Sequence, residues 1–217
     1  TQYTKSSLHS EGKANTGQGN GRLDTRAPAN EGADTYVYDP ANPVPTRGGN
    51  LLPVPLGAGP AEQGELSSRQ DVLVFSTEPL QRDTEVTGPI TMTLYAASTA
   101  PDTDFTAKLI DVHPDGKAYN LADGIIRARY RESLKQPRLI EPGKVYEYTI
   151  DLVATSNLFK QGHRIRVDIS SSNFPRFDRN PNTGHTFGED AQMVKATQTI
   201  HHARNYPSHI VLPIIPR

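Results

Sequence analysis

The 217-residue chain has no cysteine and no tryptophan, and its 23 Lys and Arg nearly balance its 24 Asp and Glu. Without cysteine, the chain cannot form disulfides, thiolate nucleophiles, zinc–sulfur sites or iron–sulfur clusters. A formal net charge of −1 argues against a partner held mainly through its phosphates, so we do not expect nucleic acid as a partner. The length is nevertheless sufficient for a sizeable hydrophobic core.

Long apolar runs are missing as well. No stretch approaches the roughly 18–20 residues that a membrane helix requires, and the first five residues, TQYTK, lack the charged-then-apolar order of a signal peptide. We therefore expect no membrane partner. The chain begins at Thr1 rather than at Met, which suggests a fragment or a processed product.

Proline and glycine are plentiful, with 18 and 17 copies, and they follow no period, which favours many short strands and turns. We expect residues 1–70 to be irregular, because they contain a Gly/Asn-rich stretch at 17–21 and a run of prolines at 40–60. Apolar residues such as Tyr36 and Leu51 indicate that this segment wraps the rest of the chain.

From Asp71 onward, apolar and polar residues alternate in short runs that are separated by turn sequences. The predicted strands cover residues 72–75, 90–98, 105–109, 125–131, 145–152, 165–170, 194–201 and 208–214. Antiparallel strands with one apolar face each must bury those faces against a second sheet. We therefore predict an all-β fold, a jelly-roll β-sandwich similar to galactose-binding domains, as one domain over residues 1–217 with its main strands in 71–217.

Two of these runs are informative in detail. Ile165, Val167 and Ile169 alternate with charged residues, so we expect all three to face the core. Residues 189–203 have the composition of a helix, but their β-branched residues and their alternation favour a strand.

No catalytic constellation is evident. A serine hydrolase of the α/β type needs its nucleophile in a Gly-x-Ser-x-Gly elbow, and no such pattern occurs in the chain. The serines at 170–172 could be paired with His163 or His185 as a base, but serine clusters of this kind are ordinary turn sequences. We predict no catalytic residues.

The densest acidic patch comprises Asp102, Asp104, Asp111 and His113. It lacks the ligand spacing of a calcium loop, so a structural role, with Asp104 capping a turn, is favoured over a structural Ca²⁺. His201 and the following His202 point to opposite faces of a strand and cannot share one metal without a bulge. We expect neither a metal nor a cofactor.

Residues 174–180 interleave aromatic and cationic side chains, a composition that can stack on a ligand. A possible ligand-contact loop therefore comprises Phe174, Arg176, Phe177 and Arg179. Structural packing is the competing interpretation of the same residues.

Longer sequence strings resemble a known family in their order along the chain. They are DTYVYDP at 34–40, PVPTRGG at 43–49, DVLVFST at 71–77, DTDFTAKL at 102–109, DGIIR at 123–127 and SSSNFPRFDRN at 170–180. Together they identify the chain as similar to the C-terminal non-catalytic domain of the CocE/NonD serine hydrolases, which include X-Pro dipeptidyl-peptidases.

This resemblance implies an accessory domain. In the family, the catalytic residues belong to a preceding α/β-hydrolase domain that carries a helical cap, and these two domains are the implied partners. In the esterases of the family, the segment matching Asn50, Leu51, Leu52 and Pro53 lines the acyl pocket. This sequence departs at Pro53, where those esterases have an aromatic residue. The compartment stays open, and the bacterial cytoplasm is the favoured location.

Two other functions stay open at this stage. A free-standing carbohydrate-binding jelly roll is suggested by fold analogy alone, and it would need exposed aromatic residues on one face. An enzyme with an unrecognised site is the second alternative. The leading hypothesis is an accessory domain that stabilises a serine hydrolase and lines one side of its acyl pocket.

Overall fold

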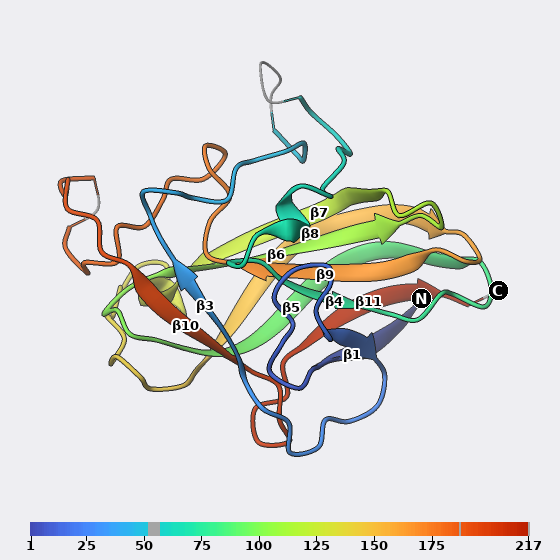
Figure 1. Ribbon diagram of the computed structural model, residues 1–217, viewed down its shortest axis with the longest axis horizontal. Coiled ribbons are helices and arrows are strands. Elements are labelled where there is room, and N and C mark those ends of the chain that lie inside the picture. The colour runs from blue at the N-terminus through green and yellow to red at the C-terminus, as the bar shows by residue number, and fades with distance from the viewer. Residues whose placement is uncertain (52–56, 187, 217) are drawn as a thin grey trace.

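The computed structural model describes residues 1–51, 57–186 and 188–216, and these residues form a sandwich of β-strands (Figure 1). The strands are β1 (Gln2–His9), β2 (Arg22–Asp24), β3 (Asp34–Tyr38), β4 (Leu73–Ser76), β5 (Thr84–Ser98), β6 (Asp104–Val112), β7 (Ala118–Arg127), β8 (Tyr146–Phe159), β9 (Arg164–Ser170), β10 (Ala196–His201) and β11 (His209–Ile215). Two single 3-10 turns, η1 (Leu66–Ser68) and η2 (Ala128–Tyr130), interrupt the loops. No helix among the described residues has the length and apolar character needed to cross a membrane.

The strands form one continuous hydrogen-bonded order, β3-β10-β5-β11-β1-β2-β4-β9-β6-β7, and β8 pairs with β5 as a branch. The described strand pairs are antiparallel, apart from the short parallel contact between β2 and β4. The sheet folds over on itself, so that β8 lies against β7 and β6. The all-β jelly-roll sandwich expected from the sequence is confirmed, whereas its likeness to galactose-binding domains stays a prediction.

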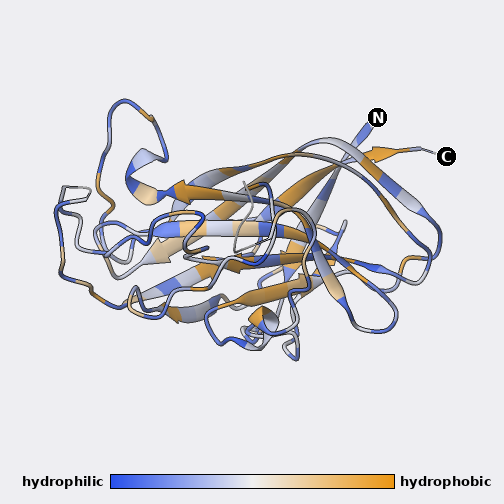
Figure 2. Cartoon of the chain, turned by 90° about the horizontal axis from the view of Figure 1, so that it is seen from above, coloured by the Kyte–Doolittle hydropathy of each residue, from blue (hydrophilic) through white to orange (hydrophobic). Residues whose placement is uncertain are grey.

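The core lies between the two layers and follows from the alternation in the strands. Phe105 of β6 meets Tyr148 of β8 across the sandwich, with ring centroids 4.8 Å apart. Ile165, Val167 and Ile169 are buried in the same core, as predicted. Figure 2 shows hydrophobic segments recurring along these strands. Burying such side chains supplies most of the stabilising free energy of the fold.

Most of the strands predicted after Asp71 are confirmed to within a few residues, but the strand predicted at 125–131 is wrong over much of its length. β7 begins at Ala118 and ends at Arg127, and η2 follows it. The chain bends there because the Ala128 N–H donates to the Thr103 carbonyl, 2.8 Å away, and the Asp102 carboxylate accepts the Arg129 N–H at 2.9 Å.

The expectation that residues 1–70 are irregular is also wrong, since they contain β1, β2 and β3. β1 lies inside the sheet between β11 and β2, and β3 forms its edge next to β10. Further along this segment, a second small core forms on the outer face of the sandwich. It consists of Val44, Leu66, Val72 and Val74.

This second core also buries the charged face of β9. Arg166 donates two hydrogen bonds of 2.6 Å to Asp168, and both side chains are almost inaccessible to solvent. Gln63 and Lys108 are buried beside them and are joined by a 3.4 Å hydrogen bond. Both faces of β9 are therefore covered, one by the main core and the other by the segment before β4.

Candidate functional site

The structure places the residues just before the predicted pocket wall beside the predicted ligand-contact loop. Residues 44–46 lie parallel to residues 173–175, with a bridge between Pro45 and Phe174. The Phe174 N–H donates to the Val44 carbonyl at 3.0 Å, and the Thr46 N–H donates to the Phe174 carbonyl at 2.7 Å. The Arg176 N–H then donates to the Thr46 hydroxyl at 3.1 Å. Backbone pairing thus fixes residues 44–46, which precede the predicted pocket wall by four residues, against the predicted ligand-contact loop.

Arg176 extends this junction to the sheet. Its guanidinium forms an ion pair and hydrogen bond with Asp123 of β7, whose other carboxylate oxygen accepts a hydrogen bond from the Asn173 amide at 3.0 Å. Both partners of the ion pair are largely buried. Arg176 is therefore a structural cation with little capacity left for a ligand.

Gly49 passes directly over this ion pair. A Cβ at Gly49 would lie 2.8 Å from Nη1 of Arg176 and 3.4 Å from Oδ2 of Asp123, and its φ of +103° is one that L-residues rarely adopt. Gly49 also pairs with Gly59 through two backbone hydrogen bonds of 2.7 and 2.9 Å. The two glycines are thus paired, and Asn50 and Leu51 follow directly after Gly49.

Asn50 and Leu51 are the two residues of the predicted pocket wall that the structure describes. Asn50 is exposed and Leu51 is half-buried. Leu52 and Pro53 lie outside the described residues. Asn50 borders a hollow of about 50 Å³ that Asp123, Val153 and Arg176 also line. A hollow of this size holds a water molecule or two rather than a substrate.

Val153 in this hollow has a strained backbone. Its φ is +65°, which is rare for a β-branched residue, and its side chain is 58% exposed. The strain coincides with a shift of the register between β8 and β5. Strained residues of this kind gather at functional sites, so Val153 belongs to the candidate site. Sequence analysis did not predict this strain, because nothing in the local pattern marks a bulge there.

The remaining residues of the predicted ligand-contact loop mostly contact one another. The Arg179 guanidinium lies 5.2 Å from the ring centroid of Phe174, and that of Arg176 lies 5.0 Å from the ring centroid of Phe177. Arg179 also donates to the Pro40 carbonyl at 3.3 Å. Phe174 alone of these four is exposed. A ligand-contact role for this loop stays a prediction, with Phe174 as its most accessible residue.

The acidic patch predicted at Asp102 and Asp104 has structural partners that sequence reasoning missed. Arg129 pairs with Asp102 at 2.8 Å, and Arg127 pairs with Asp104 at 2.8 Å. The Asn180 amide donates to both carboxylates, at 2.8 and 2.9 Å. Burial raises the pKa of Asp104 to about 6, although the bonds from Arg127 oppose this shift. The network ties the end of the 174–180 loop to the sheet.

None of the serines at 170–172 is hydrogen-bonded to a histidine in the described structure. Ser170 donates to the Ser172 carbonyl, Ser171 bonds to the Tyr36 hydroxyl, and Ser172 accepts the Val44 N–H. His163 and His185 bond instead to Asp111 and Asp190. The pairing considered at the sequence level is therefore absent from the described residues.

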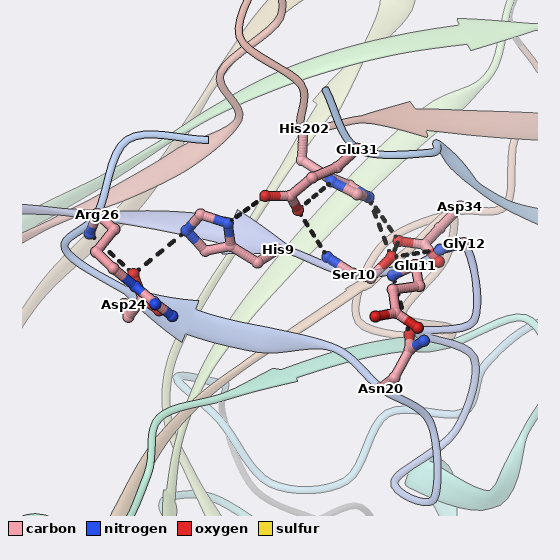
Figure 3. Close-up of polar contacts among 10 residues, drawn as sticks. All are labelled: His9, Ser10, Glu11, Gly12, Asn20, Asp24, Arg26, Glu31, Asp34 and His202. Carbon is pink, nitrogen blue, oxygen red and sulfur yellow. Dashed lines mark hydrogen bonds and ion pairs between the residues drawn. The ribbon is translucent and has the colours of Figure 1, made fainter. Parts of the chain in front are cut away.

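A different serine, Ser10, does lie beside a histidine and two carboxylates (Figure 3). Its hydroxyl is 2.6 Å from Asp34 and 3.2 Å from Nε2 of His202, which is itself 2.9 Å from the same Asp34 oxygen. Ser10 donates to the carboxylate rather than to the imidazole, and Ser10, Asp34 and His202 are all buried. This geometry cannot activate a nucleophile toward a substrate. The cluster joins β1, β3 and the end of β10.

The same cluster continues to His9. His9 lies 2.7 Å from Glu31 and 3.3 Å from Asp24, and the Ser10 N–H donates to Glu31 at 3.1 Å (Figure 3). Burial acts to raise the pKa of Glu31, but the hydrogen bonds from His9 and from backbone N–H groups outweigh it, so the pKa is lowered.

The chain is a β-sandwich without an assembled catalytic site among its described residues. A family model, the X-Pro dipeptidyl-peptidase C-terminal non-catalytic domain, matches residues 1–211. The chain belongs to this family of C-terminal domains, as the sequence strings predicted.

Two individual relatives of the chain are described as esterases. Cocaine esterase from Rhodococcus sp. (strain MB1 Bresler) is 53% identical over 219 residues, which cover 100% of this chain and 38% of the esterase. A putative serine esterase from Mycobacterium tuberculosis is 28% identical over 201 residues, covering 85% of this chain and 30% of that protein. The chain thus spans less than two fifths of the length of either relative.

Solved structures share the fold. An aminopeptidase from a marine sediment archaeon matches with a TM-score of 0.86 and 34% identity, covering 100% of this chain and 37% of its own. An α-amino acid ester hydrolase matches with a TM-score of 0.84 and 30% identity, covering 98% of this chain and 36% of its own. A CocE/NonD family hydrolase from Staphylococcus aureus shares the fold at 17% identity and a TM-score of 0.67.

Proposed function

We propose that this chain is the accessory domain of a CocE/NonD-type serine hydrolase that cleaves acyl esters or X-Pro peptides. It packs against an α/β-hydrolase catalytic domain and its cap, stabilises them, and contributes residues 50–53 to one wall of the acyl pocket. The family match over residues 1–211 and the names of the relatives support the link to a hydrolase.

The observation that carries the proposed role is the anchoring of Gly49. Its backbone is held by Gly59 on one side and by the Arg176–Asp123 ion pair beneath it. A rigid anchor lets the residues that follow it hold their side chains in a defined position at a neighbouring surface. Leaving apolar loop residues such as Leu51 in water is unfavourable, which supports their covering by a partner domain.

The test uses the complete hydrolase that carries this chain. Leu52→Ala should change the ratio of kcat/KM between bulky and small acyl groups about 10-fold to 100-fold, which corresponds to roughly 1–3 kcal/mol, while the melting temperature stays nearly constant. Leu134→Ala is the matched control, because Leu134 is highly exposed in a different loop. A constant ratio together with a lowered melting temperature would assign Leu52 to packing and refute the specificity role.

A carbohydrate-binding module is the second candidate, and one surface favours it. Tyr206 stacks near Tyr95 and His201, with centroid distances of 5.8 and 5.3 Å, and the Tyr95 hydroxyl donates to Glu147 at 2.6 Å. Aromatic rings beside a carboxylate suit a sugar. Calorimetric titration with galactose and galacto-oligosaccharides tests this candidate, since binding that Tyr206→Ala abolishes would support it. If no binding is measured, the carbohydrate-binding function is refuted and the accessory role in a hydrolase is the remaining candidate.

A further inference from the structure

Three metal-ligating side chains converge at one end of the β6–β9 pair. Asp111 lies near the end of β6, His113 follows β6 in the turn to β7, and His163 precedes β9. Nδ1 of His163 is 2.9 Å from Oδ1 of Asp111, and Nε2 of His113 is 3.8 Å from Oδ2 of the same carboxylate. The two imidazole rings lie 4.4 Å apart between centroids. One ligand atom from each residue lies within 4.8 Å of the other two.

The fold holds these residues in place through regular pairing. In the antiparallel register of β6 and β9, Asp111 is opposite Ile165 and Val112 is opposite Arg164. The turn after β6 is closed by the His113 N–H, which donates to the Lys117 carbonyl at 2.8 Å. The His163 N–H similarly donates to the Lys160 carbonyl at 3.0 Å. The backbone supporting the cluster is therefore ordered by hydrogen bonds.

The position of the cluster separates it from the candidate site described above. β9 runs from Arg164 to Ser170, and the 174–180 loop follows its far end. β6 likewise runs away from Asp104, which contacts Asn180, toward Asp111. The Asp111 cluster consequently lies at the opposite end of these two strands from the Arg176 junction.

We propose that Asp111, His113 and His163 bind a first-row transition metal ion, of the Zn²⁺ class. Two imidazole nitrogens and one carboxylate oxygen form the ligand set that these ions favour, whereas Mg²⁺ and Ca²⁺ require mainly oxygen ligands. Among the residues that the structure describes, this is the one group in which three such side chains converge.

Only small movements would complete the site. Ligand atoms around Zn²⁺ lie about 2.0–2.2 Å from the ion and therefore more than about 3 Å from one another, so the Asp111–His163 pair must open slightly and His113 must move closer. Asp111 and His163 are 10% and 14% exposed and provide a fixed pair, while His113 is 39% exposed and can move toward them. The exposed side of His113 leaves water access to a fourth coordination position. Bound metal would link the β6–β7 turn to the β8–β9 turn.

The acidic patch found in the sequence contains two of the three ligands of this site. Asp111 and His113 belong to the acidic patch considered for Ca²⁺, but the fold separates them from Asp102 and Asp104 and adds His163 from 50 residues further along the chain. The sequence prediction that no metal binds is therefore set against a specific cluster of three ligands, which the following experiment decides.

The test is a Zn²⁺ titration of the tag-free 217-residue chain by calorimetry, with metal analysis after dialysis. We expect one bound Zn²⁺ per chain, and little heat with Mg²⁺ or Ca²⁺. His113→Gln should weaken binding at least about tenfold, and His163→Gln should do the same. His185→Gln is the matched control, because His185 contacts one carboxylate, Asp190, at the same 2.9 Å distance but has no third ligand.

Each outcome is decisive. Wild-type binding that His185→Gln keeps and the two cluster variants lose supports the site. Absence of saturable Zn²⁺ binding in the wild-type chain overturns it, and so does unchanged binding in His113→Gln. His113 lies half-exposed in a turn, so His113→Gln should keep the fold, which circular dichroism verifies before the titration. If His163→Gln fails to fold, the His113→Gln result decides alone.

Discussion

Arg176 and Asp123 form a largely buried ion pair directly below the backbone of Gly49, and they come from parts of the chain 53 residues apart. The pair therefore joins the 174–180 loop to β7 directly beside the backbone of Gly49. Substituting Arg176, Asp123 or Gly49 should therefore disturb the positions of the other two residues.

Arg176→Ala should lower the free energy of unfolding by roughly 3–5 kcal/mol, because it leaves the buried carboxylate of Asp123 without its cation. Urea unfolding of the chain measures this change. Arg26→Ala is the control, since Arg26 pairs with Asp24 on the surface, where such pairs contribute about 0–1 kcal/mol. Equal small effects of both substitutions would mean that the Arg176 ion pair is not buried in solution.

Gly49→Ala should also destabilise the chain, by about 1–3 kcal/mol, because the added Cβ meets Nη1 of Arg176 in a backbone conformation that alanine disfavours. Gly116→Ala separates the two causes. Gly116 has a φ of +87°, but nothing lies within 4 Å of its would-be Cβ. A melting temperature lower for Gly49→Ala than for Gly116→Ala reports the contact, and equal values would argue against it.

Val153→Gly should stabilise the chain by up to about 1 kcal/mol, although it removes side-chain atoms, because glycine adopts a φ of +65° without strain. Val37→Gly provides the comparison in edge strand β3, where Val37 is also exposed and its φ is not positive. There the same change should destabilise by about 1 kcal/mol. Thermal unfolding of both variants measures the contrast, and destabilisation by Val153→Gly would show that its side chain contributes more than its backbone strain removes.

Acid should unfold the chain partly through Glu31. The pKa of Glu31 is below its ordinary value of 4.5 in the folded state, so the unfolded chain takes up this proton first as the pH falls. The stability from this group is complete well above pH 4.5 and is lost as the pH falls through the folded-state pKa. Its neighbours in the cluster are His9, Asp24, Asp34 and His202.

Glu31→Gln should therefore reduce the difference in unfolding free energy between pH 7 and pH 3.5, measured by urea denaturation. Glu65→Gln is the control, because Glu65 is an exposed surface partner of Arg47. An unchanged pH dependence in Glu31→Gln would show that other carboxylates govern acid unfolding.

How far the sequence predicts this fold depends on where each strand lies. β5 and β9 could be located from the sequence because apolar residues alternate with polar or charged residues along both strands. β1 could not, since Leu8 is its only large core residue and its other residues are mostly polar, although it occupies the middle of the sheet. Its position follows from backbone pairing with β11 and β2, and no local pattern records that pairing.

The candidate site shows the same limit. The resemblance identified residues 50–53, and the mixture of aromatic and cationic residues identified the 174–180 loop, yet neither signal predicts that residues 44–46 pair with this loop. The contacts join residues about 130 positions apart, such as Thr46 and Arg176. Arg127 and Arg129 were missed for a similar reason, because a charged residue in a predicted strand does not indicate which carboxylate it meets.

The pairing of β1 with β11 has a mechanical consequence. Gln2 lies opposite Ile214 in an antiparallel register, and Figure 1 shows the two chain ends at the same side of the molecule. A pulling force applied between these two ends would load the β1–β11 hydrogen bonds one after another, as in opening a zipper, rather than all at once in shear. The sandwich should therefore yield at low force along this axis, and resist more strongly when it is pulled between Thr106 and Arg164, which lie at opposite ends of the antiparallel β6–β9 pair and load its hydrogen bonds in shear.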